Sequence, residues 1–131
     1  MEITAPTQTL GKSAEEVYDF LNELSNIEKL MPEDLEAFEV TGDDSLFFVL
    51  KGMPKIYLER GEYDRPSKLV LQSSREAYEF HIAAQIDAVD ESQCEVIFEF
   101  QGNFNMLMAM MIKTPITNLI NAMAENLQKL S

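Results

Sequence analysis

The sequence predicts an α+β protein in which an antiparallel sheet packs against an amphipathic C-terminal helix. Residues 114–130 space their large apolar side chains as one stripe of a helix does, and no such stripe occurs between Pro32 and Phe100. That middle region alternates polar and apolar residues and is divided by turn-forming residues, which is typical of strands and hairpins. Because the links between successive strands are short, neighbouring strands should run antiparallel.

Length and composition predict a single cytoplasmic domain. At 131 residues, the chain can bury a core of its own, and we expect residues 1–131 to form one domain. The one cysteine, Cys94, precludes an internal disulfide and fits a reducing compartment. The first residues carry no basic region followed by an apolar run, and the most apolar stretch, 106–112, is too short to span a bilayer. We therefore expect no stable membrane insertion.

The charge of the chain argues against two classes of partner. The formal net charge is −13, from 23 acidic and 10 basic residues. Such a field repels nucleic-acid phosphates and anionic lipids, so we expect no nucleic-acid binding.

One histidine and one cysteine among scattered acidic residues form no metal-ligand pattern, and the chain has no glycine-rich phosphate loop and no nucleophile elbow. We expect neither a cofactor nor a metal.

The N-terminal region predicts a strand followed by two short helices. Residues 2–9 are rich in threonine and contain Pro6, which suits an edge strand because proline cannot donate to the ladder. Ser13 and Glu16 have the spacing of a capping box, and apolar residues at helical spacing follow them. A second short helix over 26–31 ends at the proline that follows.

The middle of the chain predicts six strands in succession. Most of these segments alternate apolar and polar residues along their length, as half-buried strands do. One segment, 46–50, is an unbroken apolar run, which indicates a strand covered on both faces. The predicted strands are 36–41, 46–50, 55–63, 68–73, 78–88 and 94–100.

The closing helix is predicted to begin at Thr114. Threonine is a good N-cap, and Pro115 would then occupy the first helical position, where its missing N–H costs nothing. The methionine-rich segment 106–111 precedes this start; if it is helical, Pro115 interrupts or kinks it, and the segment becomes a movable lid.

Three local patterns resemble a known superfamily. They are Ala14-Glu15-Glu16-Val17-Tyr18-Asp19-Phe20-Leu21 after the first strand, Leu30-Met31-Pro32 at the end of the second helix, and Lys113-Thr114-Pro115-Ile116 before the closing helix. With the order of elements, they resemble the START-like superfamily, also called SRPBCC or Bet v 1-like. The resemblance implies a helix-grip fold, in which a curved antiparallel sheet of about six to seven strands wraps around a long C-terminal helix and leaves an apolar cavity. Members bind lipids, sterols or polyketides, and a minority are cyclases or hydratases.

The resemblance also implies which side chains face the cavity. They are the apolar residues on the inner side of the strands, with residues of the closing helix above them. Strict alternation along the strands places Tyr78 and Arg60 on the same side as these apolar residues, so both could offer polar contacts in the cavity. Arg60 equally suits the exposed end of its strand. The ligand-binding candidates are Leu58, Arg60, Leu71, Tyr78, Phe80, Ile82, Phe98, Phe100, Met110, Leu119 and Met123.

The function that follows is a small cytosolic carrier or sensor of a hydrophobic molecule, such as a lipid, polyketide or isoprenoid-like compound. Large and small residues are mixed on the inward face and tryptophan is absent, so we expect an apolar cavity of at least about 300 Å3. Its mouth should lie near residues 106–111. Two alternatives remain open: a cyclase or dehydratase acting through Tyr78 or Arg60, and a module that binds a protein through a sheet edge or the methionine-rich segment.

Overall fold

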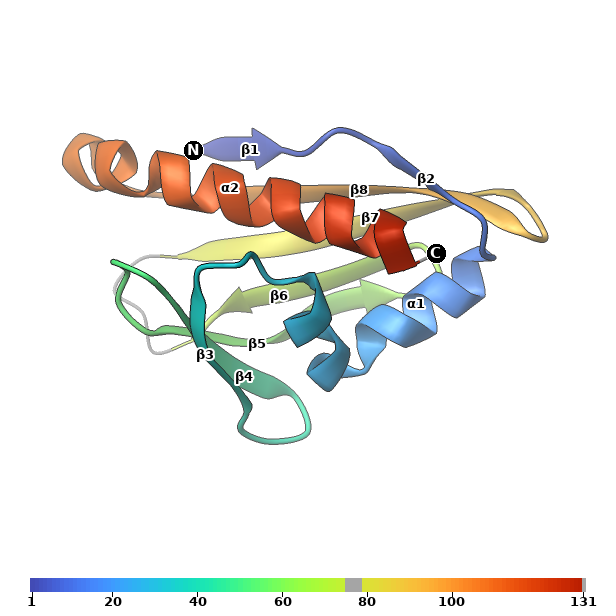
Figure 1. Cartoon of the computed structure of the whole chain (residues 1–131), viewed down its shortest axis with the longest axis horizontal. Helices are drawn as coiled ribbons and strands as arrows, with labels where there is room; N and C mark the ends of the chain where they lie inside the picture. Colours follow the sequence, from blue (N-terminus) through green and yellow to red (C-terminus); the bar gives the residue numbers. More distant parts are fainter. Residues whose placement is uncertain (75–78, 131) are drawn as a thin grey trace.

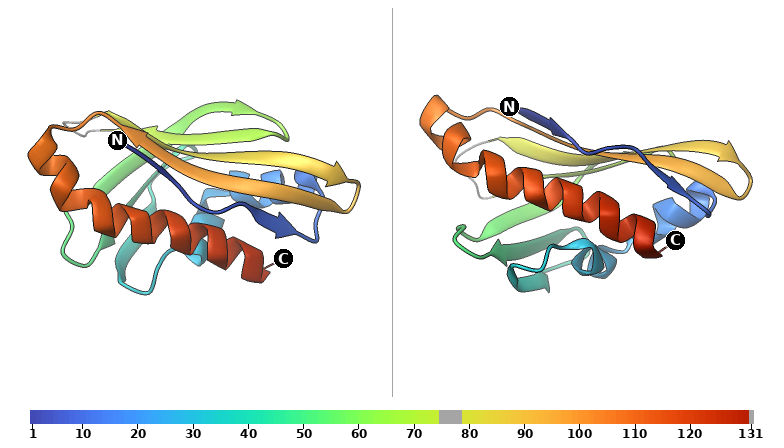
Figure 2. Two further views of the ribbon diagram at one scale, coloured as in Figure 1. Left: turned by 90° about the horizontal axis from the view of Figure 1, so that it is seen from above. Right: turned by 45° about the horizontal axis from the view of Figure 1, so that its top comes forward.

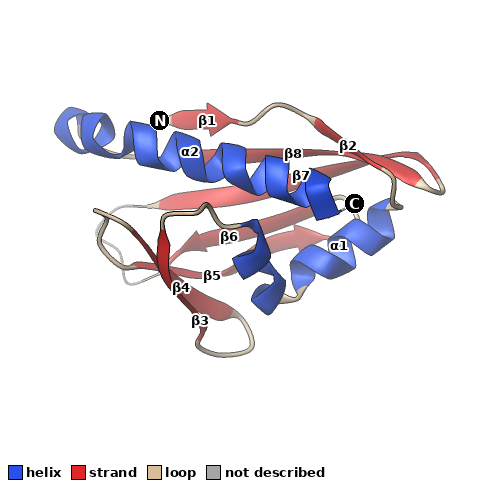
Figure 3. Cartoon of the chain, viewed as in Figure 1, coloured by secondary structure: helices blue, strands red, loops and turns tan. Residues whose placement is uncertain are grey.

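The computed structural model describes residues 1–74 and 79–130 of the chain, and Figure 1 shows its arrangement. Within these residues the elements follow the predicted order of strand, short helices, strands and long helix (Figure 3). They are β1 (Glu2–Thr4), β2 (Gln8–Leu10), α1 (Ala14–Asn22), the 3-10 helix η1 (Leu24–Leu30), β3 (Leu35–Val40), β4 (Ser45–Leu50), β5 (Ile56–Asp64), β6 (Lys68–Ser73), β7 (Phe80–Asp90), β8 (Gln93–Gly102) and α2 (Met106–Leu130).

The described strands form one eight-stranded antiparallel sheet. Strands β3 to β8 are each paired with the next along the chain, so the predicted meander is confirmed. The predicted single strand over 2–9 is wrong, because β1 and β2 are separate and both pair with β8. Ala5 still donates its N–H to the Phe98 carbonyl at 2.9 Å, but Pro6 has no N–H to continue the ladder.

The sheet is curved, and its concave face holds the helices (Figure 2). Helix α2 lies along this face next to β8, while α1 contacts β6, β7 and β8. Alternate strand residues point inward and form the core. In β8, for example, Cys94, Val96, Phe98 and Phe100 are all buried. The helix-grip architecture predicted from the resemblance is therefore confirmed.

The expectation that 46–50 is covered on both faces is wrong. In β4, Leu46, Phe48 and Leu50 are buried, whereas the intervening Phe47 and Val49 are only half-buried. Among the described elements, no second layer covers Phe47. Its ring instead lies 5.7 Å from that of Tyr57 on the next strand, with the Lys55 ammonium 4.3 Å from its centroid.

The capping box of α1 is present. The Glu16 N–H donates to Ser13 Oγ at 3.1 Å, and the Ser13 N–H donates to Glu16 Oε1 at 3.3 Å. At the other end of this region, Asn126 of α2 donates to the carbonyls of Leu30 and Met31 at 3.0 and 3.2 Å. These bonds fix the end of η1 to the closing helix.

Helix α2 begins at Met106 rather than at Thr114, which corrects the predicted start. The Asn105 carboxamide caps it by accepting the Met108 N–H at 2.8 Å, and Pro115 lies inside the helix. Proline removes one backbone donor and crowds the preceding turn, and the axis bends in this region (Figure 2). Residues 106–111 are good helix formers, so the helix extends through the proline instead of starting at it.

Candidate ligand-binding site

A small apolar cavity lies between the concave face of the sheet and the helices. Its volume is about 30 Å3, roughly the share of liquid volume that one water molecule takes. The predicted cavity of at least about 300 Å3 is therefore wrong for this conformation. The lining residues are Leu21, Leu24, Ile27, Arg60, Leu69, Val70, Leu71, Ile82, Ala84, Phe98 and Met123.

The cavity is small because helices at one end of the sheet fill space that the strands leave. Leu21 of α1 and Leu24 and Ile27 of η1 are 3–4% exposed and pack against the strand residues. Alternation along β7 would place Ala88 inward as a further small residue, but Ala88 is exposed near the end of the strand. The apolar spacing of α1 and η1 is visible in the sequence and could have identified these three additional wall residues.

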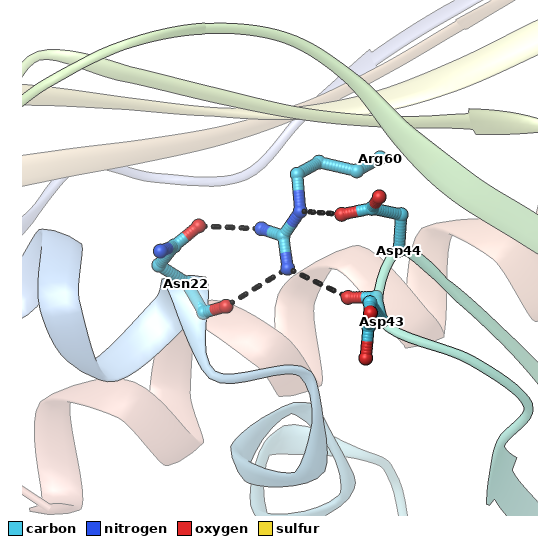
Figure 4. Close-up of polar contacts among 4 residues, drawn as sticks. All are labelled: Asn22, Asp43, Asp44 and Arg60. Atoms are coloured by element: carbon cyan, nitrogen blue, oxygen red, sulfur yellow. Dashed lines mark hydrogen bonds and ion pairs between the residues drawn. The ribbon is translucent and has the colours of Figure 1, made fainter.

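Arg60 is the only charged side chain among the described residues that line the cavity. Its side chain is 17% exposed and is held by four hydrogen bonds (Figure 4). Nε donates to Asp44 Oδ1 at 3.0 Å, and the other guanidinium nitrogens donate to Asn22 Oδ1, to the Asn22 carbonyl at 3.1 Å and to the Asp43 carbonyl at 3.5 Å. Arg60 therefore joins β5 to the end of α1 and to the β3–β4 turn.

The same guanidinium borders an open depression on the outside of the molecule. This depression has a volume of about 830 Å3 and is lined by Tyr18, Asn22, Asp44, Ser45, Glu59, Arg60, Gly61 and Tyr63. Burial, and secondarily the nearby Tyr63, raises the pKa of Tyr18. Arg60 thus forms part of the wall between the apolar cavity and this polar depression.

The structure brings five of the predicted site residues together around the cavity: Arg60, Leu71, Ile82, Phe98 and Met123. Three others, Leu58, Phe100 and Leu119, are buried in the core but do not reach the cavity. Met110 was expected above the cavity, yet its side chain is 73% exposed, and in this part of α2 it is Ile112 that packs against the core. Tyr78 lies outside the described residues.

Phe80 belongs to an aromatic stack rather than to the cavity wall. Its ring lies 5.5 Å from that of Phe100 and 6.1 Å from that of Phe104. Gly102 makes room for the stack, because a Cβ at this position would approach the Phe104 ring to 2.4 Å. The stack fixes the loop from which α2 begins.

The predicted mouth is also misplaced, since no residue of 106–111 lines the cavity. A hollow of the predicted volume, about 310 Å3, lies instead on the surface between α1 and the end of α2. It is an open groove lined by Leu10, Lys12, Glu16, Val17, Phe20, Lys29, Leu127 and Leu130, and it is separate from the core cavity.

Neither metal chemistry nor an activated thiol is indicated by the described side chains. No three of their histidine, cysteine, aspartate or glutamate residues gather as metal ligands would. Cys94 is fully buried, and burial raises the pKa of its thiol. Helix α2 and the other described helices also lack the combination of length and apolar character that crossing a membrane requires.

Comparison with known proteins relates the chain to others through its fold. No protein-family model and no curated protein matches the sequence. Among solved structures, norcoclaurine synthase from Thalictrum flavum in complex with dopamine and hydroxybenzaldehyde superposes with a TM-score of 0.73 at 12% identity, over 99% of this chain and 85% of that one.

Two bacterial proteins are similar in shape as well. The protein XoxI from Bacillus cereus has a TM-score of 0.76 at 9% identity, with 98% of this chain and 94% of that chain covered. A conserved protein from Geobacillus kaustophilus has a TM-score of 0.69 at 14% identity, with coverages of 99% and 94%. At such identities the likeness concerns architecture. The chain shares the helix-grip fold with these proteins, as the resemblance in its sequence implied.

Proposed function

We propose that the protein is a cytosolic binder or carrier of a small hydrophobic molecule, held between the concave face of the sheet and α2. The observation that carries this proposal is the apolar cavity at that place, whose described lining is hydrocarbon except for Arg60. The fold supports it, because a protein of the same architecture has been solved with small aromatic molecules bound. Arg60 would give the ligand a polar contact at one end.

A ligand larger than a water molecule requires the cavity to expand. The wall with most freedom is the one made by η1 and Arg60, because η1 is a 3-10 helix, whose hydrogen bonds have poorer geometry than those of an α-helix. Displacing the guanidinium from Asn22 and Asp44 would join the cavity to the outer depression. We therefore expect the ligand to enter past Arg60 rather than past 106–111.

Two buried phenylalanines on β8 allow a matched test. Phe98 lines the cavity and Phe100 does not, although their side chains are 2% and 1% exposed and share one face of the strand. Phe98→Leu should enlarge the cavity and tighten binding of the apolar dye ANS, whereas Phe98→Trp should fill it and weaken binding. The same changes at Phe100 should leave dye affinity unchanged.

Dye affinity would be measured by fluorescence titration, with thermal melts to confirm that each variant is folded. Native mass spectrometry of the purified protein would show whether it retains a small molecule. The proposal fails if the dye binds none of these proteins and no molecule is retained. It also fails if changes at Phe98 and Phe100 shift dye affinity equally, because the dye would then be reporting loosened packing.

A further inference from the structure

The guanidinium of Arg60 limits the kind of molecule that the cavity can accept. Arg60 is the only charged residue among the described residues that line the cavity, and its side chain is 17% exposed. A guanidinium offers only N–H donors and carries a permanent positive charge. A ligand that fills the cavity and extends past Arg60 must therefore present hydrogen-bond acceptors to it, and a cationic ligand would be repelled.

The ion pair between Arg60 and Asp44 is the contact that a ligand can replace. Among the described contacts, Asp44 meets the guanidinium through one oxygen, Oδ1, which lies 3.0 Å from Nε, and the side chain of Asp44 is 71% exposed. An ion pair this exposed contributes little to stability, so its carboxylate can return to water at small cost. The carbonyls of Asn22 and Asp43 can hold the guanidinium again once a ligand has entered, because they belong to the backbone.

The charge of Arg60 favours an anion over a neutral acceptor. If a neutral group replaced Asp44, the guanidinium would lose its counter-ion at the edge of a hydrocarbon cavity, which is costly. A carboxylate restores the pair, and its two oxygens can accept two parallel N–H bonds from a guanidinium. Glu59, the other described carboxylate that lines the depression, accepts from Gln72 Nε2 at 3.1 Å instead.

We infer that the ligand is an amphipathic acid, with a small apolar body that occupies the cavity and a carboxylate that takes the place of Asp44 on Arg60. This inference rests on the proposed function, because it names the class of molecule for the same cavity. It also makes Asp44 a competitor of the ligand. The net charge of −13 repels anions in general, so a preference for an anionic ligand has to come from a specific cation such as Arg60.

Two dyes with the same rings test the role of the charge. ANS carries a sulfonate, whereas N-phenyl-1-naphthylamine has the same anilinonaphthalene rings and no charge. The sulfonate stands in for a carboxylate as an anionic oxygen group. Fluorescence titration gives the affinity of each dye, and the ratio of the two affinities is compared between variants. Changes in packing that affect both dyes equally cancel in this ratio.

Arg60→Met should lower the preference for ANS by about tenfold or more, because the charge-assisted bonds are lost while the apolar wall remains. Arg65→Met is its control, since Arg65 is 53% exposed and lines neither the cavity nor the depression. Asp44→Asn should raise the preference several-fold, because it weakens the competitor and keeps the cation. Asp19→Asn removes the same charge from the neighbouring pair with Arg65, and it should leave the ratio unchanged.

The carboxylate itself is tested by displacement of the neutral dye. Phenylacetate should compete at lower concentration than phenylethanol, which has nearly the same shape and no charge. Arg60→Met should remove this difference. Thermal melts show whether each variant is folded, and if Arg60→Met does not fold, the ratio for Asp44→Asn decides.

The outcomes separate this inference from the proposed function. If neither dye binds the folded protein, both fail. If both dyes bind and Phe98→Trp weakens both, the proposed function is supported. The amphipathic acid is then overturned if Arg60→Met and Asp44→Asn leave the affinity ratio unchanged, or if phenylethanol competes as well as phenylacetate.

Discussion

Arg60 connects three separate parts of the chain through one side chain. Its guanidinium donates to the last residue of α1 and to two residues of the β3–β4 turn, while its own backbone belongs to β5. Alternation along the strand predicted that Arg60 points inward with its apolar neighbours, and it does line the cavity. The acceptors could not be predicted, because Asn22 and Asp44 lie 38 and 16 positions away and only the fold brings them together.

Replacing Arg60 by methionine should lower the free energy of unfolding by about 1 to 2 kcal/mol, since the apolar stem remains but the bonds to Asn22 and Asp44 are lost. Arg65→Met provides the control. Arg65 also bonds to α1, through Asp19 at 3.0 and 3.1 Å, but both side chains are more than half exposed. Arg65→Met should therefore alter the free energy of unfolding so little that urea titrations barely detect the difference. Equal losses for the two variants would contradict the special role of Arg60.

Cys94 should make the protein sensitive to alkali. Burial raises the pKa of its thiol above the ordinary value of 9.0, so the unfolded chain ionises before the folded one does. The contribution of the protonated Cys94 thiol to the free energy of unfolding is complete below about pH 9. It is lost as the pH rises through the pKa of the thiol in the folded protein. Urea titrations between about pH 8 and 10 should show a shallower decline for Cys94→Ala than for the unchanged protein. Parallel declines would show that the thiol does not contribute.

Helix α2 is packed on the sheet by fully buried residues after Pro115, whereas before Pro115 it contacts the core through the partly buried Ile112. The apolar stripe of 114–130 correctly identified the docked part, in which Ile116, Leu119, Ile120 and Met123 are buried. The predicted helix began at 114 because proline is a common first residue of helices, and a helical 106–111 was considered only as an alternative. Asn105 followed by several good helix formers was the signal for the earlier start.

The same substitution should destabilise the protein strongly in the buried part of α2 and hardly at all in the exposed part. Leu119 is 0% exposed, so Leu119→Asp should cost several kcal/mol or prevent folding, because it buries an unpaired charge. Leu107 is 69% exposed, and Leu107→Asp should leave the melting temperature nearly unchanged. An unaltered melt for Leu119→Asp would mean that α2 is not docked on the sheet.

For the whole molecule, the alternation of apolar and polar residues predicted the topology of the sheet but not the volume of the cavity. Alternation shows which side of a strand faces the helix, and it correctly placed Phe98 and Phe100 of β8 on the buried side. It does not show how far α1 and η1 reach across the sheet, and their leucine and isoleucine side chains occupy the space expected for a ligand. Cavity size depends on side chains from several elements at once, so it becomes visible only in the assembled structure.

Net charge gives a prediction for the whole surface. With a charge of −13, the protein should bind neither duplex DNA nor anionic vesicles at about physiological salt. Fluorescence anisotropy with labelled DNA and vesicle co-sedimentation would measure this at micromolar protein. Binding to either that weakens as salt is added would contradict it and would reveal a basic patch hidden by the overall charge.

The two edges of the sheet have a consequence for behaviour in crowded solution. One edge consists of the short strands β1 and β2 with Pro6 between them, and the other is β3, where Glu36 and Glu39 are exposed. Short strands, a proline and charged side chains all hinder the addition of a further strand from another molecule. The protein should therefore stay free of fibrils and strand-exchanged aggregates at concentrations where a long, uncharged edge would begin to polymerise.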